Sequence, residues 1–111
     1  MGVLDRAVEH FDGLGTGSFE VPEWVEDGKP CVIYHTAFTV AEKKKLYKFA
    51  KEDDLEFLVR VVILKALDKN GEKLFDVGDK VTLMNRVSSD IIERVAGQLN
   101  SSPTMEDQLG N

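Results

Sequence analysis

Three side chains of this 111-residue sequence belong to types that bind transition metals or act as nucleophile and base: His10, Cys31 and His35. Cys31 and His35 are four residues apart, so a strand would place both on one face, too far apart for simple chelation. His10 could complete a zinc site only if the N-terminal segment docked nearby. Nothing next to Cys31 in the sequence would activate its thiol, so we expect neither a metal site nor a Cys-His nucleophilic pair.

The acidic residues Asp53, Asp54 and Glu56 could form a metal site or an acid-base pair. The same residues can end one helix and cap the next without any further assumption, and we favour that interpretation. The run 68–71, Asp-Lys-Asn-Gly, resembles the start of a calcium loop, but its glycine falls at the fourth position and not the sixth. A reverse turn explains this run better, with Gly71 supplying a positive φ angle.

The glycines at 13, 15 and 17 are spaced like part of a phosphate-binding loop. They lack a preceding strand and the Lys-Ser/Thr ending that such loops need, so the signal is weak. No pattern in the chain therefore points to catalysis. We expect a protein that is not an enzyme and that uses no metal and no cofactor.

Charge and hydropathy exclude several further classes. The net charge is −6, and the sequence lacks the continuous run of Lys and Arg that phosphate neutralisation requires, so we expect no nucleic-acid binding. No apolar run is long enough to cross a bilayer, because Arg60 interrupts the best one, and no signal peptide is apparent. The single cysteine suits a reducing compartment. We therefore expect a cytoplasmic protein without membrane contact.

The basic residues are concentrated in the middle of the chain. Residues 39–73 contain 9 basic and 7 acidic residues, for a net charge of +2, whereas residues 1–38 carry −5 and residues 74–111 carry −3. The main cluster consists of Lys43, Lys44 and Lys45, with Lys48 and Lys51. Its simplest interpretation is a solvated helix face, and the alternative is a landing patch for an acidic partner.

The hydrophobic pattern predicts a small α+β protein, with four to five helices and one β-hairpin in the N-terminal half. Residues 1–18 should form an amphipathic helix and a flexible connector, residues 19–100 a single globular domain, and residues 101–111 a mobile tail. Within the domain, residues 19–25 and 31–37 read as the hairpin. The Thr39-x-x-Glu42 capping box starts a helix expected to reach residue 51, with Leu46, Tyr47, Phe49 and Ala50 facing inward.

The second half of the domain reads as helical. Apolar residues recur at helical spacing from Leu55 onward and predict a central helix over residues 55–67. The turn at 68–71 and a short extended segment at 73–75 should follow it. Asp79 should cap a helix over 80–87 that turns Val81, Leu83 and Met84 inward. A last helix begins near Ser88 and carries an apolar stripe of Ile91, Ile92, Val95, Ala96 and Leu99.

The order of these parts resembles the tail assembly chaperones of long-tailed, siphovirus-type bacteriophages. The matching features are Val21-Pro22-Glu23-Trp24 before the hairpin, Thr39-x-x-Glu42, and the central helix ending in residues 67–75, Leu-Asp-Lys-Asn-Gly-Glu-Lys-Leu-Phe. Asp79, Leu83, the Ile91/Ile92/Val95 helix and Leu99-Asn100 follow in the same order. The resemblance covers about residues 21–111. His35 departs from it, because an Arg would be expected there, and residues 25–29 form a longer, more acidic turn.

The resemblance implies a chaperone, encoded by a phage or prophage, that binds the tape-measure protein. It would keep that protein soluble in the bacterial cytoplasm during virion morphogenesis, while tail-tube subunits polymerise around it. The resemblance also implies a longer form made by a −1 programmed frameshift. Leu109-Gly110-Asn111 can be encoded as CUG GGA AAC, which contains the slippery heptamer G GGA AAC.

A chaperone for a long helical client needs exposed apolar patches rimmed by charge. We expect partner binding through Leu4, Val8 and Phe11 of the first helix, through Trp24 and Tyr34 of the hairpin, and through Lys44 and Lys48. Self-association is a further possibility. Two other hypotheses remain open. One is an acidic inhibitor or nucleic-acid mimic that blocks a host enzyme, and the other is a small enzyme or metal protein with a pocket that unites His10, Cys31 and His35.

Overall fold

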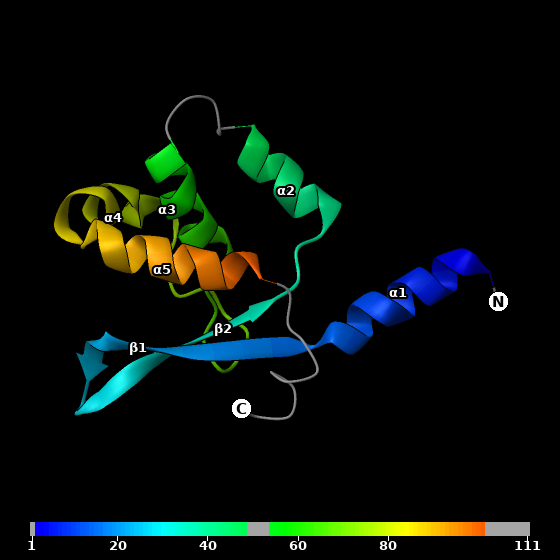
Figure 1. The fold of residues 1–111 in the computed structure, drawn as a ribbon, viewed down its shortest axis with the longest axis horizontal. Helices are drawn as coiled ribbons and strands as arrows, with labels where there is room; N and C mark the ends of the chain where they lie inside the picture. Colours follow the sequence, from blue (N-terminus) through cyan, green and yellow to red (C-terminus); the bar gives the residue numbers. More distant parts are fainter. Residues whose placement is uncertain (1, 49–53, 102–111) are drawn as a thin grey trace.

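The computed structural model describes residues 2–48 and 54–101, and these segments form five α-helices, one 3-10 helix and two strands (Figure 1). The prediction of a mostly helical α+β protein with one N-terminal-half hairpin is confirmed. In chain order the elements are α1 (Val3–Leu14), β1 (Thr16–Glu26), β2 (Lys29–Thr36), α2 (Val40–Tyr47), α3 (Asp54–Lys65), η1 (Val77–Asp79), α4 (Lys80–Arg86) and α5 (Ser89–Asn100).

The antiparallel hairpin is longer than the sequence predicted. Its turn consists of Asp27 and Gly28, which both have positive φ angles of 55° and 78°, as a tight two-residue hairpin turn requires. At the other end β1 begins at Thr16, so part of the segment expected to be a flexible connector is paired with β2. Gly17 lies opposite His35, and a Cβ atom at Gly17 would come within 2.9 Å of the His35 Nε2 atom. This glycine therefore makes room for a buried side chain.

The outer edge of β2 has a second partner. Tyr34 and Leu67 exchange two backbone hydrogen bonds of 2.9 Å each, and Leu67 forms a further bridge with Lys73. The chain between them turns as predicted: the Asp68 carboxylate accepts from the amides of Asn70 and Glu72, and Gly71 has a φ angle of 82°. Among the described residues β1 pairs only with β2, so β1 is the edge strand.

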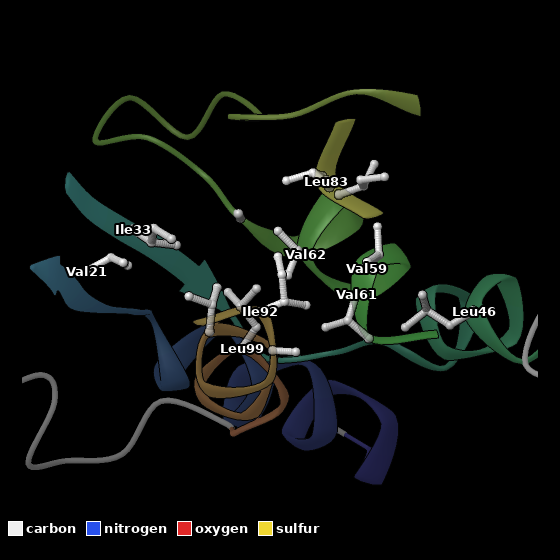
Figure 2. Packing of buried hydrophobic residues seen from close by; sticks show 13 residues of the cluster. Val21, Ile33, Leu46, Val59, Val61, Val62, Leu83, Ile92 and Leu99 are labelled. Carbon is white, nitrogen blue, oxygen red and sulfur yellow. The ribbon is translucent and has the colours of Figure 1, made fainter. Parts of the chain in front are cut away.

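The core lies where α3 and α5 pack against one face of the hairpin. Figure 2 shows Val21 and Ile33 of the hairpin at one end of the buried cluster and Leu46 of α2 at the other. The stripe predicted for α5 is confirmed, since Ile92, Val95, Ala96 and Leu99 are buried and Ile91 packs against the cluster. At the surface, Arg94 of α5 donates to both carboxylate oxygens of Glu23 in β1.

Several inward-facing assignments were wrong because α2 and α4 each bury a single side chain, and because Leu55 lies in the first turn of α3. Exposed side chains occur at four positions expected to face inward: Tyr47, Leu55, Val81 and Met84. α2 ends at Tyr47 and buries Leu46, and α4 has seven residues and buries Leu83. Asp79 does not cap α4 with its side chain; its carboxylate instead accepts from the backbone amide of Asp76, which starts the 3-10 turn. Phe49, Ala50, Asp53 and residues 102–111 lie outside the described residues.

Candidate partner-binding site

The first candidate surface is the apolar face of α1. At about 100° per residue, five side chains fall on one side of this helix, and we call them the apolar stripe: Val3, Leu4, Ala7, Val8 and Phe11. Leu4 is 77% exposed and Val8 52%, and no residue of α1 is buried. Figure 1 shows α1 projecting away from the helices that cover the hairpin. The sequence therefore placed Leu4, Val8 and Phe11 together correctly, on a helix that its own core does not cover.

Trp24 and Tyr34, expected to form a hairpin surface, are not joined in one exposed face. Trp24 is half-buried against the core, with its ring edge-on to Phe75 at a centroid distance of 6.2 Å. Tyr34 follows the buried Ile33 on β2, so its side chain lies on the opposite face of that strand. Neither side chain adds to the apolar stripe, and the hairpin is a weaker candidate surface than the sequence suggested.

The second candidate surface is a groove between α2, α3 and the start of α4, with a volume of about 400 Å³. We call it the basic groove. Its floor consists of the apolar side chains of Leu46, Ile63, Leu64 and Val77. Its rim consists of five cationic side chains, Lys45, Lys48, Arg60, Lys73 and Lys80. None of the described residues that line it is acidic.

Glu56 organises one side of this rim. Its carboxylate lies 2.9 Å from Lys80 Nζ and 3.1 Å from Arg60 Nη2. The hydrogen bond from Lys80 and then that from Arg60 lower the pKa of the Glu56 carboxyl, so it is ionised at neutral pH. Glu56 therefore holds two cations of the rim in place. Lys45, Lys48 and Lys73 make no ion pair with a described residue.

The two predicted lysines differ in their positions. Lys48 lines the basic groove, whereas Lys44 is exposed on α2 and does not. Arg60, Lys73 and Lys80 were not predicted as members of a site, because they come from three separate segments of the chain. One signal was available for Arg60: a single cation inside an otherwise apolar helical run marks a position where the apolar face ends at a charged rim.

The residues considered for metal or nucleophilic chemistry are not gathered into a site. His35 is buried against Phe19, and His10 is exposed on α1. Burial, and to a smaller extent the charge of Glu26, raise the pKa of the Cys31 thiol, which makes it less reactive. Within residues 2–48 and 54–101, no three His, Cys, Asp or Glu side chains lie close enough together to hold a metal ion. In the same segments no helix has the length and apolar character needed to cross a membrane.

Comparisons with known proteins found no relative of this chain. No protein-family model matches the chain, and neither a curated protein nor a solved structure is significantly similar to it.

Proposed function

We propose that this chain is a phage tail assembly chaperone, which binds a long helical tape-measure protein in the bacterial cytoplasm and keeps it soluble until tail-tube subunits surround it. The observation that supports this proposal best is the apolar stripe of α1, which no element within residues 2–48 and 54–101 buries. The order of sequence features supports the choice of client, because it resembles that of such chaperones from Val21 onward.

The physical argument concerns the stability of α1. A 12-residue helix is marginal in water on its own, and an amphipathic helix normally gains stability by covering its apolar face. A second amphipathic helix could cover the stripe through side chains spaced three and four residues apart. Such pairing would hide apolar surface on the client, which is the surface that otherwise drives aggregation.

Co-expression with a candidate client, a long coiled-coil protein of the tape-measure type, tests this function. The soluble fraction of that client should rise markedly when the wild-type chain is present. A double variant Leu4→Asp/Val8→Asp should lose this effect, because two carboxylates would enter the apolar stripe. The proposal is contradicted if the client's solubility is the same with and without the chain.

Arg6→Asp provides a matched control. It changes the net charge by the same −2 as the double variant, but it lies on the polar side of α1. The client should remain soluble with Arg6→Asp. Equal loss with both variants would show that net charge, and not the apolar stripe, determines the effect.

A further inference from the structure

The basic groove concentrates positive charge in an acidic protein. The whole chain carries −6, yet five cationic side chains from α2, α3, α4 and the segment after Leu67 surround this one depression. Glu56 neutralises part of that charge, and Lys45, Lys48 and Lys73 remain exposed without an ion pair to a described residue. A concave surface lined by one sign of charge attracts ligands of the opposite sign. The groove is therefore suited to an anionic partner.

The floor of the groove restricts the chemistry of that partner. Leu46 and Ile63 are buried parts of the core, and Val77 at the edge is 78% exposed. A phosphate backbone would gain from the rim but leave this apolar floor uncovered. A peptide segment that carries carboxylates beside leucine-like side chains would use both the rim and the floor. The surface thus favours an acidic amphipathic segment over a nucleic acid.

The groove is also pre-formed. Leu46 and Ile63 of its floor are buried in the core and Leu64 packs against it, and the contacts of Glu56 with Arg60 and Lys80 hold one side of the rim. A volume of about 400 Å³ falls in the range of preformed ligand sites. Pre-organisation reduces the entropy lost on binding, so a short segment can bind without reordering the protein.

We propose that the basic groove is a second binding site, separate from the apolar stripe of α1, for an acidic amphipathic helical segment of the client. This inference rests on the proposed function for the identity of the client, but the chemistry of the segment follows from the groove alone. Carboxylates spaced three or four residues apart would contact Lys45, Lys48 and Lys73. The apolar side chains between them would cover Ile63 and Leu64.

A labelled helical peptide tests this site directly. The probe is a synthetic peptide of about five turns with Glu and Leu on one face, and the matched peptide has Gln at each Glu position. In fluorescence anisotropy at low salt, the wild-type protein should bind the Glu peptide at least about 10-fold more tightly than the Gln peptide. Equal affinity for the two peptides would overturn the proposal, as would tighter binding of a single-stranded oligonucleotide of equal charge.

Two double variants with the same change in net charge locate the binding. Lys45→Glu/Lys73→Glu alters the rim and should weaken binding of the Glu peptide by about 10-fold or more. Lys44→Glu/Lys69→Glu alters exposed lysines outside the groove and should change the affinity by less than about 2-fold. All four side chains are exposed, so both variants should fold. Equal losses in both variants would overturn the assignment to the groove.

The client-solubility assay separates this proposal from the function on which it rests. If the wild-type chain binds the Glu peptide through the groove but does not keep the client soluble, the groove is supported and the chaperone function fails. If the client is kept soluble and the peptides bind equally, the chaperone function is supported and the groove proposal fails.

Discussion

Among single residues, Lys65 has the least usual environment, because it is a charged side chain that is only 2% exposed. Its ammonium donates to Thr36 Oγ1 at 3.2 Å, to the Ala37 carbonyl at 3.3 Å and to Glu42 Oε1 at 3.1 Å. It also lies 4.8 Å from the centre of the Phe38 ring. Lys65 thus links the end of α3, through hydrogen bonds and an ion pair, to the segment that runs from the end of β2 into α2.

Removing Glu42 should lower the stability of the protein more than removing its ion-pair partner Lys65. Glu42→Gln should lower the free energy of unfolding by about 3 kcal/mol, because it leaves a buried ammonium without its counter-ion. Lys65→Met should cost less, about 1 to 2 kcal/mol, because the remaining Glu42 carboxylate is 32% exposed and can be hydrated. Urea unfolding measures both values, with exposed Lys44→Met as the control. A larger loss for Lys65→Met would contradict this order.

The same pair makes stability depend on pH. Burial alone would raise the pKa of the Glu42 carboxyl, but hydrogen bonds from Thr39 and the ion pair with Lys65 together lower it below its usual value. A lowered pKa in the folded state stabilises the protein fully above the unfolded value of about 4.3 and less as the pH falls through the folded value. The stability difference between wild type and Glu42→Gln should therefore shrink below about pH 4.3. A constant difference in urea unfolding from pH 7 to pH 3 would refute this linkage.

Gly17 should tolerate no side chain. Gly17→Ala would place a Cβ atom 2.9 Å from the buried His35 ring, and the resulting overpacking should cost about 1 to 3 kcal/mol of stability. Gly97→Ala is the control, since nothing lies within 4 Å of a Cβ at that exposed position in α5. It should be neutral or stabilising by up to about 1 kcal/mol, because alanine favours a helix. Similar unfolding curves for the two variants would show that the His35 ring can move aside.

At the scale of elements, α1 stands apart from the rest of the protein because it contributes no buried residue. Deleting residues 2–14 should therefore change the free energy of unfolding of the remaining domain by less than about 0.5 kcal/mol. Trp24 fluorescence reports this unfolding, since its ring packs against Phe75 in the core region. A loss of several kcal/mol would mean that α1 supports the domain and would weaken its proposed role as a client-binding helix.

Helix periodicity predicted most elements, and local chemistry explains the errors. The capping box at Thr39 and Glu42 starts α2 as expected, and the apolar spacing of α5 gives its buried face. The start of β1 was missed because Gly15–Ser18 has the composition of a loop. Gly17 is required there by His35, which lies 18 residues away in the sequence. A constraint of this kind cannot be read from either residue alone.

For the whole molecule, the shared core predicts cooperative unfolding. The hairpin, α2, α3, α4 and α5 all contribute to one cluster of buried residues, so none of them should unfold first. Urea transitions followed by Trp24 fluorescence and by far-ultraviolet circular dichroism should coincide once the signal of α1 is removed by the 2–14 deletion. A lower midpoint in the fluorescence transition would show that the hairpin separates from the helices before they unfold.

The candidate sites differ in how far the sequence could reveal them. The apolar stripe lies within one helix, so its spacing predicted it and the structure confirmed that Leu4, Val8 and Phe11 share a face. The basic groove depends on tertiary structure, because Lys45, Arg60, Lys73 and Lys80 meet only after α2, α3 and the segment before α4 pack together. The run of lysines in the sequence indicated a basic surface on α2. It could not show which of these lysines face the groove, because that depends on how α2 packs against α3.

The edge strand β1 affects how the protein behaves at high concentration. No described residue pairs with its other side, and backbone groups there can hydrogen-bond to any extended chain, which is a usual route to aggregation. Pro22 has no amide hydrogen to offer, and the register shifts between Val21 and Val25. A strand adding to this side would meet both interruptions, so regular pairing should be confined to about the first half of β1. The hairpin that helps to build the core is thereby a poor template for fibrils, a useful property in a protein whose proposed task is to prevent another chain from aggregating.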